Sequence, residues 1–271
     1  MIIKALVENT SDKLACEHGL SLYIQTGNHR ILFDTGASPL FATNARQLGV
    51  DLESIGMVVI SHGHDDHGGG LKTFFGLNKT AKAYISQHAF GSFYSKHGSQ
   101  WEYIGLDRDL VGCDRFILVD DALDIDRDLS VFSHVMGERF FPTGNQALFT
   151  SAGTSLVLDD FSHEQNLVIR ENGRILLVVG CSHRGVVNIL ESYHQRYGGF
   201  PTHVIGGFHL YNHSTGKAEE PETLDGIATY LLSTGADFHT CHCTGEIAYR
   251  HLKTRMGQRM GYMSTGMELR I

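Results

Sequence analysis

The sequence lacks the features that would place it on nucleic acid or in a membrane. Its 22 Lys and Arg residues are outnumbered by 30 Asp and Glu, so the formal net charge is −8 and no broad basic surface is expected. No apolar run reaches the roughly eighteen residues that a membrane-spanning helix needs. The first residues do not form a basic region followed by an apolar stretch. We therefore expect a soluble, cytoplasmic protein with neither a nucleic-acid nor a membrane partner.

Cysteine is also scarce, and its spacing excludes a disulfide framework or a structural zinc ribbon. The odd number of five favours reduced thiols, at Cys16, Cys113, Cys181, Cys241 and Cys243. Histidine, by contrast, is abundant. The 17 histidines are dispersed along the chain, and several stand at the ends of apolar runs. This placement is not explained by packing alone.

Short apolar runs of strand length alternate with segments of helical periodicity over the 271 residues, and we expect one domain, 1–271. Helices are predicted after Pro39, between Pro221 and Gly235, and around positions 186–197 and 248–256. The strands predicted from these runs are 2–7, 20–25, 30–33, 57–60, 83–85, 116–119, 165–169, 175–179, 202–205, 238–241 and 262–271. This order predicts an α/β fold, a four-layer αββα sandwich of two mixed β-sheets. Segment 77–160, with the single Trp101, has the weakest periodicity and is either a cap over a pocket or an elaborated edge of the core.

The most informative segment is Ser61 to Gly68, which contains three histidines and two aspartates directly after an apolar run. Imidazole nitrogens and carboxylate oxygens are the ligands that zinc and related divalent ions prefer. In an extended loop, positions two apart point the same way, so His62 and His64 can share one ion. Asp66 and His67 lie just beyond and can begin a second site.

Three apolar runs of the C-terminal half end in polar tips that contain histidine. The tips are GCSH, which ends at His183, GGFH, which ends at His209, and CHCTG, which contains His242. Side chains at the carboxyl ends of neighbouring strands converge on one sheet edge, where ligand sites form. If His62 and His64 lie at the same edge, these tips can complete the coordination.

These motifs together resemble the metallo-β-lactamase superfamily. SHGHDDHGG is preceded by ILFDTG and followed by GCSH, GGFH and HCTG, and the resemblance covers nearly the whole chain. EHGLS, GCSHRGVVN and HCTG are similar to the branch that contains the archaeal dihydropterin-methyl aminobenzene-ribofuranosyl phosphate synthase and uncharacterised bacterial relatives.

The resemblance implies a dinuclear site. In that superfamily the first two histidines of HxHxDH bind one metal, here His62 and His64, while the closing Asp and His, here Asp66 and His67, bind the other. Asp34, in FDTG, would orient a ligand histidine.

Two departures from the family pattern leave part of the ligand set open. Many relatives carry an Asp that bridges both ions where this chain has Cys181, so a thiolate ligand and a nonligand thiol are both compatible with the sequence. The ligand histidine of a GHTPG-like turn is missing, and His183 is proposed as its replacement on the first metal, ahead of Asp159 or Glu164.

The remaining tips complete the expected site. HCTG resembles the tip that holds the last histidine ligand, which makes His242 a ligand of the second metal. His209 has no standard ligand role and is expected to orient the substrate or to act as general acid.

The activity that these residues predict is a dinuclear metal-dependent hydrolase acting on a small-molecule substrate. Two divalent ions, zinc or else iron or manganese, would activate water, with Asp66 as a ligand that also accepts a hydrogen bond from that water. Arg184, at a helix start where free amides favour an anion, suggests a phosphorylated substrate. The sequence does not indicate the oligomeric state.

Other functions stay open at this point. The alternative is a metal-dependent transferase that joins a pterin diphosphate to an aromatic amine and releases diphosphate. A noncatalytic metal-binding module is a further candidate. An oxygen-reducing di-iron protein is disfavoured, because those proteins usually have a carboxylate where this chain has His64.

Overall fold

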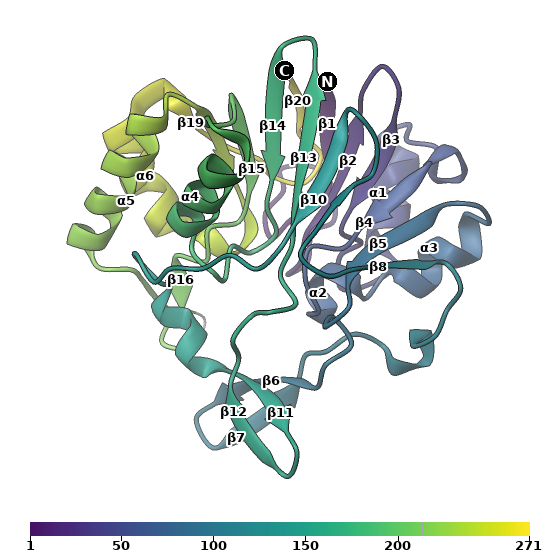
Figure 1. The fold of residues 1–271 in the computed structure, drawn as a ribbon, viewed down its shortest axis with the longest axis horizontal. Helices are drawn as coiled ribbons and strands as arrows, with labels where there is room; N and C mark the ends of the chain where they lie inside the picture. Colours follow the sequence, from purple (N-terminus) through teal and green to yellow (C-terminus); the bar gives the residue numbers. More distant parts are fainter. Residues whose placement is uncertain (213) are drawn as a thin grey trace.

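The computed structural model describes residues 1–212 and 214–271, and it contains two seven-stranded sheets that pack face to face (Figure 1). The first sheet has the order β20 (Glu268–Arg270), β1 (Ile2–Val7), β2 (Ser21–Gln25), β3 (Arg30–Phe33), β4 (Met57–Val59), β5 (Lys82–Ser86) and β8 (Phe116–Val119). The second has the order β19 (Met260–Tyr262), β18 (Asp237–Thr240), β15 (His203–Gly206), β14 (Arg174–Val178), β13 (Asn166–Glu171), β10 (Leu129–Phe132) and β9 (Ala122–Asp124). Both sheets mix parallel and antiparallel pairs.

The inner strands of the two sheets, such as β3 and β13, are largely buried on both faces, whereas the edge strands β20 and β9 are partly exposed. In β13, Leu167 and Ile169 belong to the apolar core between the sheets, whereas Val168 belongs to the core beneath the helices. This period of two follows from the alternation of side chains along a strand. It explains why these strands are continuous apolar runs in the sequence.

Helices cover the outer face of each sheet, so the four-layer αββα prediction is confirmed (Figure 1). The helices are α1 (Leu40–Gln47), α2 (Asp65–Gly68), α3 (Leu71–Leu77), α4 (Val186–Tyr197), α5 (Pro221–Thr234) and α6 (Glu246–Met256). α5 begins with Pro221, which needs no N–H at that position, and ends at Gly235, whose φ of 75° favours glycine.

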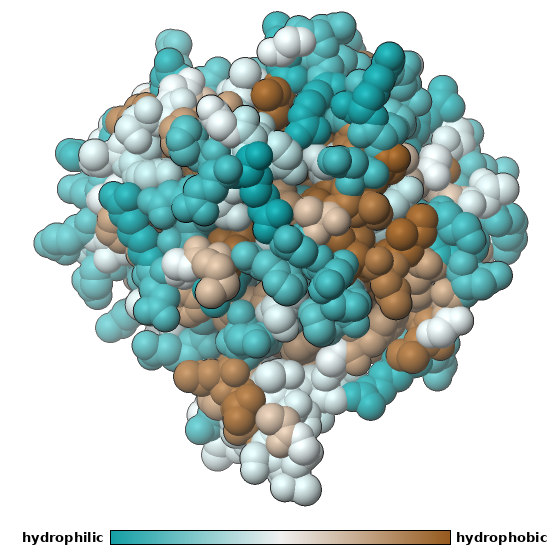
Figure 2. All heavy atoms as spheres, viewed as in Figure 1, coloured by the Kyte–Doolittle hydropathy of each residue, from teal (hydrophilic) through white to brown (hydrophobic). Residues whose placement is uncertain are grey.

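A separate four-stranded sheet projects from the sandwich and is made entirely from residues between 93 and 158. Its order is β12 (Ser155–Leu158), β11 (Leu148–Ala152), β6 (Phe93–His97) and β7 (Gln100–Tyr103). Figure 2 shows apolar surface over this part of the molecule, where Leu156, Val157 and Leu158 of β12 are exposed. Segment 77–160 thus contributes β5, β8, β9 and β10 to the main sheets and this projecting sheet besides.

The predicted last strand, 262–271, is wrong as a single element. β19 pairs in parallel with β18 in one sheet, whereas β20 pairs with β1 in the other. The turn at Gly266, whose φ is 91°, separates them, because the chain must cross between the layers. Short elements complete the fold: β16 (Tyr211–Asn212), β17 (Lys217–Ala218) and the 3-10 helices η1 (Leu52–Ser54), η2 (Arg108–Leu110), η3 (Thr143–Ala147), η4 (His242–Thr244) and η5 (Gly257–Arg259). Among the described residues, no helix is both long and apolar enough to cross a membrane.

Candidate metal centre

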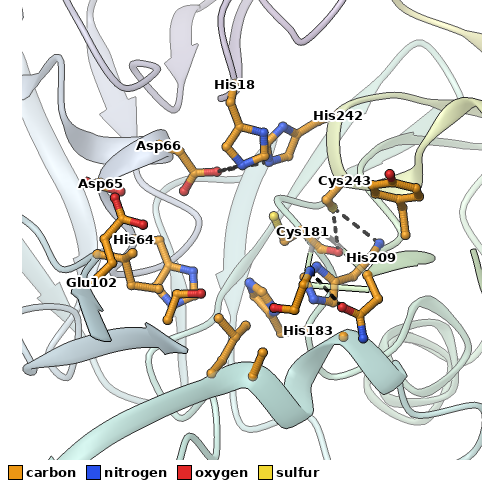
Figure 3. A pocket seen from close by; sticks show the side chains of 18 of the residues that line it. His18, His64, Asp65, Asp66, Glu102, Cys181, His183, His209, His242 and Cys243 are labelled. Carbon is orange, nitrogen blue, oxygen red and sulfur yellow. Dashed lines mark hydrogen bonds and ion pairs between the residues drawn. The ribbon is translucent and has the colours of Figure 1, made fainter. Parts of the chain in front are cut away.

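The histidine-containing tips meet at one edge of the sandwich, as the sequence predicts. The loops after β4, β14, β15 and β18 supply them, and the projecting sheet forms the opposite wall of a cavity of about 320 Å³ (Figure 3). His64 and Asp66 line this cavity together with the other predicted residues Cys181, His183, His209 and His242. His62 and His67 are fully buried directly behind them.

A first group of nitrogens gathers around His62. Its Nε2 lies 3.0 Å from Nδ1 of His64 and 3.3 Å from Nε2 of His183. Two nitrogen ligands of one zinc ion stand about 3.3 Å apart, given Zn–N bonds of ~2.05 Å at the tetrahedral angle. The sulfur of Cys181 also falls in this group, within 4.8 Å of the ligand atoms of His62 and His183.

A second group lies next to the first. Nε2 of His67 is 3.1 Å from Nε2 of His242 and 3.2 Å from Sγ of Cys181. Oδ2 of Asp66 is 3.2 Å from Nε2 of His242. Cys181 therefore stands between the two groups, where the family pattern places a bridging Asp. The structure brings together every residue that the sequence assigned to the two metals.

Hydrogen bonds fix which nitrogen of each ring faces the centre. Nδ1–H of His67 donates to Oδ2 of Asp34 over 2.6 Å, so the predicted orienting role of Asp34 has the required contact. Asn9 Oδ1 lies 2.8 Å from Nδ1 of His242, and Asn145 Oδ1 lies 3.1 Å from Nδ1 of His183. Such outer partners fix the tautomer of a metal-binding imidazole. Each of these rings is left with the Nε2 lone pair directed at the centre.

This donor set fits a cation. Two unprotonated nitrogens that face each other at 3.1 to 3.3 Å repel unless a cation or a proton lies near both. His64 presents Nδ1 to Nε2 of His62, and its other nitrogen, Nε2, is buried without a hydrogen-bond partner among the described residues. The unmatched donors, their spacing and their burial are together suited to divalent metal ions.

The electrostatics of the site point the same way. Burial alone would lower the pKa of His67, but the carboxylates of Asp66 and Asp34 raise it to about 9, because they stabilise positive charge at this ring. Burial, together with the neighbouring His163, lowers the pKa of His64 to about 3 and keeps that ring neutral, as a ligand must be. Although burial opposes it, the surrounding histidines hold the pKa of Asp66 well below its usual range.

The backbone around the site is strained in places. Asp34, Ser182, His209 and His242 are non-glycine residues with φ between 49° and 59°. Each such left-handed residue costs on the order of 1 kcal/mol or more, and strain of this kind clusters at functional sites. At Gly63 a side chain would overlap the backbone of Ala89, so the loop that carries the motif requires glycine.

Two candidate substitutes for the missing ligand histidine have other partners. The carboxylate of Glu164 accepts the backbone N–H groups of His183 and Arg184, at 2.6 and 3.0 Å. Asp159 forms a buried pair with His163 at 3.0 Å and approaches His64 Nε2 only to 4.0 Å. Both residues support the loops that carry the first group. Neither reaches it as directly as His183 does.

Arg184 is not brought into the cavity. Its guanidinium donates to the backbone carbonyls of Val135 and Gly137 and lies over the ring of Phe141. These contacts hold the segment before η3 against the start of α4. Trp101 of the projecting sheet does not line the cavity either. Its ring packs edge-on against Phe149.

Several residues of the site were missed by sequence reasoning. His18, within the EHGLS motif, lies 3.3 Å from Asp66 Oδ2, and Cys243, within HCTG, lines the cavity. Both lie in motifs that resemble the family, and this could have identified them as site residues from the sequence. No sequence feature identifies Asn9 and Asn145, because they lie in segments without periodicity and act only through tertiary contacts.

The fold and the site together define an αββα sandwich protein with a cluster of potential metal ligands at one edge. A model of the metallo-beta-lactamase superfamily matches residues 15–164, more than half of the chain. The chain belongs to the metallo-beta-lactamase superfamily. Members of this superfamily are mostly enzymes, chiefly hydrolases, and usually bind divalent metal ions.

Individual relatives cover most of the chain. An uncharacterised protein of Methanocaldococcus jannaschii is 29% identical over 249 residues, which make up 90% of this chain and 91% of that protein. The 7,8-dihydropterin-6-methyl-4-(beta-D-ribofuranosyl)-aminobenzene-5'-phosphate synthase of the same organism is 27% identical over 84% of this chain and 81% of its own length. The crystal structure of Tm1679, a metal-dependent hydrolase of the beta-lactamase superfamily, has a TM-score of 0.84 at 28% identity and matches 100% of this chain and 99% of that one. The resemblance found in the motifs is thus confirmed.

Proposed function

We propose that this protein is a dinuclear metal-dependent hydrolase of a small substrate. One divalent ion is held by His62, His64 and His183, and the other by Asp66, His67 and His242, with Cys181 between them. Zinc suits these ligands best, and iron and manganese are also compatible with them. The observation that carries the proposal is the convergence of these ring nitrogens at 3.0 to 3.3 Å, with Nδ1 of His67, His183 and His242 already hydrogen-bonded elsewhere.

When bound, two divalent ions would lower the pKa of a water molecule and polarise a carbonyl or phosphoryl oxygen. Asp66 supplies an ionised carboxylate at the cavity wall, suited to accept a proton or a hydrogen bond from water. His209 has a buried ring with no hydrogen-bond partner on either nitrogen among the described residues. Its ring lies 4.3 Å from that of His183, which suits it to orient the substrate or to protonate a leaving group.

The cavity favours a small substrate. Its volume of about 320 Å³ is at the lower end of typical ligand sites. No lysine or arginine is among the described residues that line it. A phosphorylated substrate would therefore depend on the two ions, rather than on Arg184, for neutralisation of its charge.

Reconstitution tests this proposal. Metal-free protein is loaded with zinc, manganese or ferrous iron and offered p-nitrophenyl esters of carboxylic, phosphoric and diester type. We expect turnover of at least one class that depends on the added ion and is lost in His62→Ala. Full occupancy by two ions without turnover of any class would contradict the hydrolase assignment.

A second candidate, a transferase that joins a pterin diphosphate to an aromatic amine, is favoured by the similarity to the dihydropterin-related synthase. The same ions would then bind the diphosphate leaving group. The two functions are separated by measuring diphosphate release with and without the amine. A hydrolase releases diphosphate in both cases, whereas a transferase requires the amine.

A further inference from the structure

Cys243 is a buried thiol of the cavity wall that the proposed ion pair does not use. It is only 2% exposed, it follows His242 directly, and its side chain points toward Cys181 and His209 (Figure 3). We infer that Cys181, His209 and Cys243 form a separate cation site for thiophilic metal ions, which competes with the ion pair for Cys181.

The donor atoms of these three residues are already gathered. Their sulfur and nitrogen atoms all lie within 4.8 Å of one another. Two sulfur ligands of one zinc ion stand about 3.8 Å apart, given Zn–S bonds of ~2.3 Å at the tetrahedral angle. Side-chain rotations that shorten these separations by about 1 Å are sufficient to bring the three atoms onto one ion. Gly207 permits the approach, because a side chain there would meet the sulfur of Cys243.

His209 provides an independent indication of a ligand. Its side chain is only 8% exposed, and neither ring nitrogen has a hydrogen-bond partner among the described residues. A buried polar group left in this state is destabilising, so such groups usually serve a bound partner. The backbone amide of His209 donates to the sulfur of Cys243 over 3.3 Å, which fixes the two residues relative to each other.

The chemistry of the three donors selects the ion. Two thiolates and one imidazole, without a carboxylate, favour soft d10 cations such as zinc and cadmium over manganese. Binding releases the two thiol protons to solvent, because the thiolate is the ligand. The ion pair is rich in imidazole and carboxylate and has only one sulfur, so the two sites differ in preference.

Competition follows from the shared thiol. Cys181 belongs at once to this group, to the group with His62 and His183, and to the group with His67 and His242. A thiophilic ion that takes Cys181 and His209 withdraws both from the roles assigned above. This consequence for turnover rests on the proposed function, whereas the binding itself does not.

Cadmium is the probe for the test, because its thiolate complexes absorb in the ultraviolet and the signal counts sulfur ligands. The base protein carries Cys16→Ser and Cys113→Ser, which remove the accessible thiols outside the cavity. Metal-free protein is titrated with cadmium and the charge-transfer absorption is recorded. In Cys243→Ser we expect roughly half of the absorption per ion, because one of the two sulfur ligands is lost. Its cadmium affinity should fall by more than the roughly 10- to 100-fold that follows the loss of a residue that only orients a ligand. His209→Gln should weaken binding with the absorption unchanged.

The matched control is Cys241→Ala, which removes a neighbouring buried thiol that lies in the core between the sheets. It should titrate like the base protein, and circular dichroism checks the folding of each variant. Protein preloaded with zinc should need more cadmium for the same absorption. The inference is overturned if neither Cys243→Ser nor His209→Gln differs from the base protein, or if zinc leaves the cadmium titration unchanged. Since no substrate is used, failure of the hydrolase assignment is recognised separately, in the reconstitution assay.

Discussion

Asp34→Asn tests how the proposed second ion is held. The carboxylate of Asp34 is fully buried, and its oxygens accept hydrogen bonds from Nδ1 of His67 at 2.6 Å and from the N–H and hydroxyl of Ser61 at 2.7 Å each. The amide has nearly the same shape, but its NH₂ group cannot accept from His67. The ring then loses both its fixed tautomer and its orientation.

The expected loss is in zinc affinity at the group around His67. Removing such an outer partner costs roughly 10- to 100-fold in affinity, or about 1.4–2.7 kcal/mol. Metal-free stability should also fall by about 1–3 kcal/mol, because a buried donor is left unpaired. Equilibrium dialysis against chelator-buffered zinc, followed by elemental analysis, measures the first effect. Asp109→Asn is the control, since Asp109 is an exposed partner of Lys72. Equal zinc affinity in the two variants would refute the role assigned to Asp34.

Three further outcomes are expected. His64→Ala and Asp66→Ala should each lower metal content and activity together while the circular dichroism spectrum stays unchanged, and retained turnover in both would count against the mechanism. His209→Ala should keep both ions of the proposed pair and turn over more slowly; loss of one of these two ions would instead make His209 a ligand of the pair. Since the folded pKa of His67 is raised to about 9, its stabilising contribution to the metal-free protein is fully present below about 6.5 and is lost as pH rises through about 9. Urea unfolding at several pH values should show this decline in the unmodified protein and less of it in Asp34→Asn, and parallel curves would contradict it.

The sandwich itself could be predicted from the sequence because its inner strands are largely buried on both faces. Strands 2–7, 30–33 and 116–119 were predicted with the bounds that the structure has. The projecting sheet could not be predicted in this way. β7 and β12 are exposed along their whole lengths, so no alternation of apolar and polar residues identifies them. Their pairing depends on contacts between neighbouring strands rather than on burial.

The candidate metal centre could likewise be predicted only in part. HxHxDH is local, and its density of ligands was visible in the sequence without a structure. His183 and His242 could be placed near the site because they follow apolar strands whose carboxyl ends converge, and their ligand roles were implied by the resemblance to the family. The partners Asn9 and Asn145 could not be found, since each is brought to its histidine from a distant segment. Cys243 and His18 stood in recognisable motifs, but their proximity to the other donors became visible only in three dimensions.

We propose that distant parts of the chain hold two cations at one sheet edge. A crystal of the zinc-loaded protein, with anomalous scattering measured on both sides of the zinc absorption edge, tests it most directly. We predict two peaks, one in contact with His62, His64 and His183 and the other with Asp66, His67 and His242. A single peak, or two peaks away from these side chains, would contradict the account.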